Sequence, residues 1–121
     1  MNKKGVMIGG LVLAMAAGGM AAELLVGAAE VSITPERPVS LAGQFHQRIA
    51  RSVESPCMAN VLAMESHEAG KDPEQAIMIS VDVVSIPAEV QNDFRAHVAK
   101  LLRGFDTNKL FLAATHTHTG P

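Results

Sequence analysis

Two histidines near the end of the chain, His116 and His118, are the residues whose type and spacing most clearly suggest chemistry. They follow an apolar run, Leu110–Ala114, that we interpret as a strand, and α/β proteins usually bind ligands at the C-terminal ends of parallel strands. If the extended backbone continues past this strand, side chains two residues apart point to the same face. Two neutral imidazoles on one face could bind one zinc ion, which takes three or four ligands. The alternative is a polar strand end with two solvated histidines, because a His-x-His spacing alone is a weak signal.

Asp82 is a second candidate because it interrupts the apolar run 76–84, which we place beside the strand that carries the histidines. A buried carboxylate needs a hydrogen-bond partner. Asp82 could orient a zinc-binding histidine through the free ring nitrogen of that histidine. It could instead accept backbone N–H groups at the following turn, which is the interpretation we favour.

The polar segment 43–48 adds two candidates for the rim of an active site, His46 and Arg48. Loops carry binding and catalytic residues more often than the elements they connect. Arg51 is an equal candidate for any role in binding an anion.

Hydrophobic patterning predicts the elements that position these residues. Residues 24–33 are apolar and partly alternating, which predicts a strand, and residues 36–55 predict a loop with local turns. Residues 57–65 predict a second strand, because the turn-rich segment 66–74 is typical of a hairpin loop. The near-continuous apolar run 76–84 predicts a strand buried on both faces.

A helix is predicted after this strand. Pro87 suits a first helical turn and Gly104 suits a helix end. An apolar stripe recurs between them at helical spacing, formed by Val90, Phe94, Val98, Leu101 and Leu102. Strand, helix and strand with short connections predict a βαβ unit with parallel strands and a right-handed crossover. We therefore expect an α/β fold: a mixed sheet with a βαβ unit, its metal-site histidines at the C-terminal end of the last strand.

The first 22 of the 121 residues differ in composition from the rest. Lys3 and Lys4 precede an apolar Gly/Ala-rich run, 6–17, and small residues at 19–21 suit a signal peptidase. This layout predicts a signal peptide at 1–22 and an exported protein, periplasmic or secreted, with one domain at 23–121. An uncleaved membrane anchor is the alternative, because residues 5–22 carry no charge.

Charge and cysteine content exclude several classes of protein. Without the two lysines of the first segment, eight Lys and Arg face twelve Asp and Glu, which gives −4. An acidic chain without a basic stripe argues against a nucleic-acid partner. The single cysteine, Cys57, excludes an internal disulfide. No sequence feature sets the oligomeric state.

Four segments in order resemble the N-terminal domain of the neutral/alkaline (non-lysosomal) ceramidases and their bacterial relatives. They are VGAAEVSITP (26–35), LAGQFHQR (41–48), ISVDVVSIP (79–87) and LFLAATHTHTGP (110–121). The last resembles the family signature ATHTHSGP, with Thr119 where Ser is common. Together the four segments extend across nearly all of residues 23–121.

The resemblance implies a zinc-dependent amidase that hydrolyses the N-acyl bond of ceramide to sphingosine and a fatty acid. It implies that His116 is a zinc ligand and that His118 belongs to the catalytic site beside the metal. Zinc would polarise the amide carbonyl and lower the pKa of its bound water. The implied substrate is a lipid or another small amide, and a lipid would be met at a membrane surface.

The family's zinc site also takes a second His, a Glu and a Tyr from farther downstream, and this chain contains no Tyr. We therefore expect an incomplete domain, the N-terminal part of such a hydrolase, that is inactive alone. One alternative is a related exported metallohydrolase that acts on another amide or an ester. The other is an exported binding domain without catalytic activity.

Overall fold

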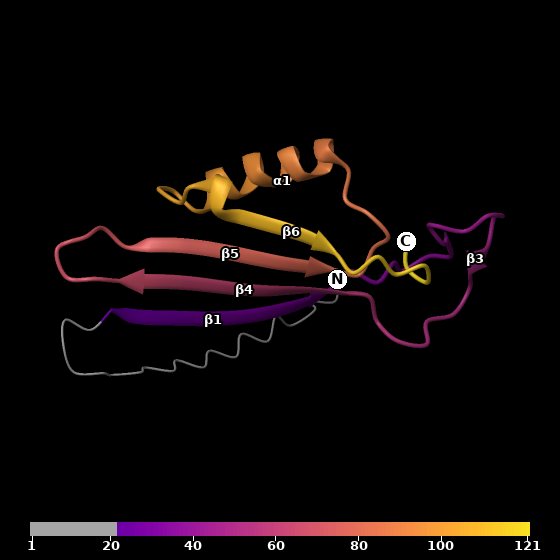
Figure 1. The fold of residues 1–121 in the computed structure, drawn as a ribbon. Coiled ribbons are helices and arrows are strands. Elements are labelled where there is room, and N and C mark those ends of the chain that lie inside the picture. Colours follow the sequence, from indigo (N-terminus) through magenta and orange to yellow (C-terminus); the bar gives the residue numbers. More distant parts are fainter. Residues whose placement is uncertain (1–21) are drawn as a thin grey trace.

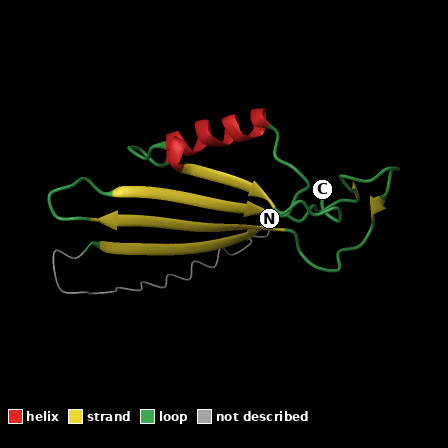
Figure 2. Ribbon diagram, viewed as in Figure 1, coloured by secondary structure: helices red, strands yellow, loops and turns green. Residues whose placement is uncertain are grey.

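The computed structural model describes residues 22–121 as a four-stranded mixed sheet, one α-helix and a small two-stranded sheet (Figures 1 and 2). The large sheet has the order β1-β4-β5-β6, with β1 at Glu23–Ser32, β4 at Met58–His67, β5 at Glu74–Val81 and β6 at Leu110–Ala114. β4 is antiparallel to both β1 and β5, and β5 is parallel to β6. The predicted α/β class and mixed sheet are confirmed. The predicted signal peptide lies, except for Ala22, outside the described residues.

The helix α1, Ala88–Leu101, lies between β5 and β6 along the chain. Pro87 is its N-cap, as suits a residue without an N–H group, and Glu89 lies in the first turn, where a negative charge is favourable. The helix ends before Gly104. The N–H of Leu102, its C-cap residue, donates to the Val98 carbonyl and completes the last turn. Gly104 has a φ of 90° in the turn that follows, and a short 3-10 helix, η1 (Thr107–Lys109), leads into β6. Within residues 22–121 no helix is long and apolar enough to cross a membrane.

The long connection between β1 and β4 contains a small hairpin that the sequence pattern did not predict. Its strands are β2, Val39–Ser40, and β3, Ile49–Ala50, which pair antiparallel. Ladders of two residues are too short to show the alternation that identifies a strand in a sequence. The hairpin lies at the end of the large sheet where β1, β5 and β6 finish, close to the C-terminus (Figure 1).

The core lies on the side of the large sheet that faces α1. Ile77 and Leu110 are paired across β5 and β6, and Leu110 is fully buried. Leu102 and Phe105, which follow α1, line a cavity together with Ile77, so the helix packs on this face. Within the described residues the buried hydrophobic side chains are Leu41, Ala59, Ile79 and Leu110.

The opposite face of the sheet is open. Leu62, Met78 and Phe111 share one cross-strand row on this face, and they are 38%, 49% and 53% exposed. The prediction that the 76–84 strand is buried on both faces is therefore wrong for β5. The physical reason is that α1 covers only one face and no described element covers the other. Part of the apolar stripe of α1 is also exposed, since Leu101 is 71% exposed.

Candidate functional site

The backbone continues its pairing with β5 beyond the end of β6 and then turns sharply. The Thr115 N–H donates to the Val81 carbonyl at 2.9 Å, and the His116 N–H donates to the Val83 carbonyl at 3.1 Å. His116 has a φ of 62°, so the backbone does not stay extended through both histidines, which was the condition for their side chains to point to the same face of a strand. A left-handed conformation costs a non-glycine residue on the order of 1–3 kcal/mol, and such residues are concentrated at functional sites.

The turn nevertheless brings the two imidazole rings together. The ring centroids of His116 and His118 lie 5.0 Å apart with an interplanar angle of 87°, and their Nε2 atoms are 3.5 Å apart. His116 Nδ1 lies 2.7 Å from the Val84 carbonyl oxygen, and His118 Nδ1 lies 2.8 Å from the Gly43 carbonyl oxygen. A carbonyl oxygen can only accept, so each Nδ1 carries the proton that it donates. In the neutral rings both Nε2 atoms therefore keep a lone pair.

The spacing of these two nitrogen atoms fits a shared metal ion. Two nitrogen ligands on a tetrahedral zinc, with Zn–N bonds of about 2.0–2.1 Å, lie about 3.4 Å apart. The measured separation of 3.5 Å is close to this value. No group of three or more His, Cys, Asp or Glu that could hold a metal occurs among residues 22–121.

Gly43 and Gln44 hold His118 in place from the loop between β2 and β3. Gly43 has a φ of 72°, and a Cβ atom there would lie 2.6 Å from His118 Nδ1. The Gln44 side-chain amide donates to the His118 backbone carbonyl at 2.5 Å, and the Ala42 N–H donates to the Gly120 carbonyl at 3.2 Å. Sequence reasoning singled out this segment but missed both residues. A glycine inside a polar loop was the only available signal.

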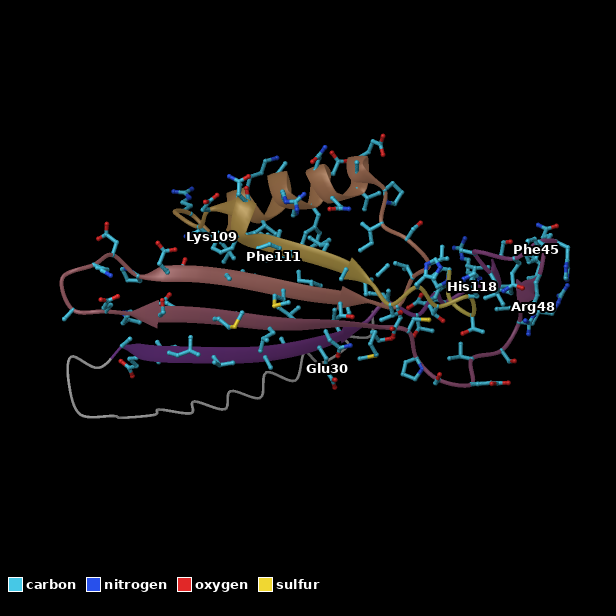
Figure 3. The ribbon with its side chains drawn as sticks, in the orientation of Figure 1. Glu30, Phe45, Arg48, Lys109, Phe111 and His118 are labelled. Atoms are coloured by element: carbon cyan, nitrogen blue, oxygen red, sulfur yellow. The ribbon has the colours of Figure 1, made fainter. Side chains whose placement is uncertain are left out.

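His46 and Arg48, the predicted rim residues, are exposed in the same hairpin. No hydrogen bond or ring contact joins His46 to the histidine pair in the described part of the chain. The Arg48 carbonyl accepts from the Leu41 N–H at 2.8 Å, which closes the hairpin. The Arg48 side chain lines a cavity of about 520 Å³ beside the C-terminal segment 119–121. His118 and Arg48 lie at the same end of the molecule (Figure 3).

Asp82 directly follows β5 and forms hydrogen bonds to Met58, the first residue of β4. It makes no hydrogen bond to either histidine. Its Oδ2 accepts from the Met58 N–H at 2.8 Å, and its own N–H donates to the Met58 carbonyl at 2.9 Å. The carboxylate therefore accepts a backbone N–H, as the favoured interpretation expected, but from the neighbouring strand rather than from the following turn. The Asp82 carbonyl lies 2.9 Å from where a Cβ of Gly120 would stand, so only glycine fits there without movement.

Comparisons with known proteins found no relative that could help to interpret this geometry. No family model, no curated protein and no solved structure matches the chain. The resemblance to the neutral ceramidases therefore rests on the four sequence segments, and the site must be interpreted from its own atoms.

Proposed function

We propose that this chain is the N-terminal part of an exported zinc-dependent amidohydrolase that resembles the neutral ceramidases, and that it supplies His116 and His118 to the active site. The observation that carries the proposal is the arrangement of the two rings. Backbone carbonyls hold both Nδ1 protons, and both Nε2 atoms are left 3.5 Å apart. Orientation of a metal-binding histidine through its other ring nitrogen is the usual arrangement in zinc sites.

In this proposal His116 holds the zinc and His118 acts beside it. A bound zinc ion would supply a Lewis acid and a water molecule of lowered pKa. His118 can take up a proton at Nε2, because its Nδ1 proton is already held by the Gly43 carbonyl. His118 is thus suited to general base chemistry on an attacking water or on a leaving group.

The fold supports this placement. We propose that β5, α1 and β6 form a βαβ unit with a right-handed crossover, since β5 and β6 are parallel neighbours and α1 lies between them in the chain. The histidines then follow the C-terminal end of a parallel strand, where α/β enzymes place their ligands. The substrate in this proposal is ceramide or another small amide, met outside the cell or in the periplasm.

Zinc content and cleavage of a fluorescent ceramide test the proposal. Both are measured on the full chain and on the product of an extended reading frame, each with His116→Ala and with His97→Ala as control. His97 is exposed on α1 and far along the chain from the pair, so its loss should change neither quantity. We expect His116→Ala to abolish zinc binding in both proteins, and we expect cleavage only in the extended one.

Other outcomes separate the alternatives. Zinc retention by His116→Ala equal to that of the control would contradict the proposal. Cleavage of other amides or esters in place of ceramide would identify a related metallohydrolase. A protein that folds without zinc and cleaves nothing in either form would be a binding domain.

A further inference from the structure

A cavity is lined by the residues that follow the histidine pair and by three arginines. It has a volume of about 520 Å³ and is formed by the β1–β4 connection together with Thr119, Gly120 and Pro121, the residues that directly follow His118. Volumes of this size are typical of small-molecule sites. The backbone hydrogen bond from the Ala42 N–H to the carbonyl of Gly120, which lines the cavity, joins the β2–β3 loop to the histidine segment. A molecule in this cavity would therefore lie beside the proposed reaction centre.

The charge of the cavity is opposite to that of the chain. Its arginines are Arg37, Arg48 and Arg51, and Glu36 and Glu54 also line it, so three positive groups face two negative ones. Residues 22–121 as a whole carry eight positive and twelve negative groups. Three of the eight cationic side chains thus line one cavity in a chain that is acidic overall.

These three guanidinium groups have no carboxylate partner within the described residues. The ion pairs found there are His67–Glu65, Lys71–Glu68 and Lys109–Glu74, and none includes a cavity arginine. All three arginines are exposed to solvent. A guanidinium group is always charged and presents a planar set of donors that matches a carboxylate or a phosphate. The walls between the arginines are partly apolar, with Leu41, Ile49 and Val53.

We propose that this cavity binds a carboxylate or phosphate group of the substrate, with Arg48 and Arg51 as its main ligands. The statement that this anionic group belongs to the substrate rests on the proposed function. If the histidine pair acts on an amide bond, the cavity favours the other small amide of the proposed function over ceramide, which carries no anionic group: an amide whose molecule also carries a carboxylate or phosphate on a short apolar stem. The binding of the anion itself requires only the arginines and the cavity.

Titration of the zinc-free full chain with N-acetylglycine, a small amide that carries a carboxylate, tests this proposal. The readout is the set of arginine Nε–Hε resonances in ¹H–¹⁵N spectra. We expect the resonances of Arg48 and Arg51 to move with the probe, and we expect Arg48→Gln and Arg51→Gln each to raise its Kd roughly tenfold. The neutral N-acetylglycinamide should not bind.

Arg103→Gln is the matched control, because it removes the same charge beyond the end of α1, away from this cavity. It should leave the Kd within about twofold of the native value. An equal loss of affinity in Arg103→Gln would show general charge attraction and would overturn the proposal. Unchanged affinity in Arg48→Gln and Arg51→Gln would also overturn it. Arg48→Lys and Arg51→Lys, which keep the charge but lose the planar donors, should bind with intermediate affinity.

The source of the anionic group is tested in a separate arm. Co-sedimentation with phosphatidylglycerol vesicles, but not with phosphatidylcholine vesicles, and loss of it in Arg51→Gln would identify a lipid head group. Binding of N-acetylglycine without vesicle binding would identify a soluble substrate. Because the titration uses no zinc, its success or failure is independent of the proposed zinc chemistry. Anion binding in a protein that never binds zinc would contradict the hydrolase and leave the anion site standing.

Discussion

The two imidazole rings are oriented by backbone carbonyl oxygens and not by carboxylates. His116 Nδ1 is held by Val84 and His118 Nδ1 by Gly43. A carbonyl fixes the tautomer and the ring orientation without adding a negative charge beside the ring. The two Nε2 lone pairs are therefore oriented without a negative charge at Nδ1. Each Nε2 atom is left to bind a metal ion or a proton.

Gly43→Ala tests whether this orientation matters. A Cβ at Gly43 would lie 2.6 Å from His118 Nδ1, so the ring must move. We expect amide cleavage by the extended protein to fall roughly 100-fold, as is usual when a catalytic group is displaced by about 1 Å, with zinc binding retained through His116. Cleavage rates and zinc content measured on the same samples check both parts.

Gly70→Ala is the control for backbone strain. Gly70 has a φ of 79°, close to that of Gly43, but nothing lies within 4 Å of its Cβ position. Both variants should lose on the order of 1 kcal/mol of stability because alanine disfavours positive φ. Only Gly43→Ala should lose cleavage, and an equal loss in Gly70→Ala would rule out the orienting role of Gly43.

At this scale the sequence reveals the type of the site residues but not their contacts. The His-x-His spacing identified both histidines, yet their rings meet through a left-handed turn at His116 that no periodicity predicts. The hydrogen bond between Gly43 and His118 joins residues 75 positions apart. Such a contact depends on the packing of the chain, which a single sequence does not encode in a local pattern.

The elements were more predictable because each has a pattern of its own. β1, β4, β5 and β6 all coincide with apolar runs, and their bounds differ from the predicted ones by a few residues. The turn-rich segment correctly indicated the antiparallel pairing of β4 with β5. The β2–β3 hairpin was missed, although it carries Gly43 and Arg48 beside the site. Short elements that are stabilised by tertiary contacts leave little signal in a sequence.

The β4–β5 hairpin carries a carboxylate that makes its stability depend on pH. The Gln75 amide, followed by the hydrogen bond and charge of His67, holds the pKa of Glu65 below its ordinary value. The folded pKa therefore lies below the unfolded one. The stabilising contribution is present above the unfolded pKa and is lost as the pH falls through the folded pKa.

We expect Glu65→Gln to decrease the loss of Tm on acidification between about pH 5 and pH 3, because the variant has no carboxylate to protonate. Thermal unfolding followed by circular dichroism over this range measures the slope. Glu68→Gln is the control, since Glu68 pairs only with Lys71 in an exposed turn. Equal slopes in Glu65→Gln and the native chain would show that Glu65 contributes nothing to the acid response.

Within residues 22–121 the large sheet has one face covered by α1 and one face that no element covers. Parallel strands normally occur in sheets with both faces covered. Here the pair β5 and β6 has α1 on one side, whereas Met78 and Phe111 face solvent on the other. Lys109 and Phe111 lie over the large sheet, away from the end of the molecule that carries His118 and Arg48 (Figure 3). The open face and the candidate site are thus separate surfaces.

Substitutions at two adjacent residues compare the two faces directly. Leu110 is fully buried and Phe111 is 53% exposed. Leu110→Ala should cost about 2–5 kcal/mol of unfolding free energy, the usual range for a buried leucine. Phe111→Ala should cost about 1 kcal/mol in the same urea titration, because about half of the Phe111 side chain stays exposed to solvent. A cost for Phe111→Ala that equals that of Leu110→Ala would show that the open face is covered in solution.

The most direct test of the proposed zinc site is a long-range ¹H–¹⁵N spectrum of the histidine side chains, recorded on the full chain before and after one equivalent of zinc. We expect His116 and His118 both to carry their proton on Nδ1 without zinc. We expect zinc to shift both of their Nε2 resonances and to leave those of the other histidines (His46, His67 and His97) in place. A proton on Nε2 of either ring in the zinc-free protein, or Nε2 resonances of the pair that do not respond to zinc, would contradict the proposed site.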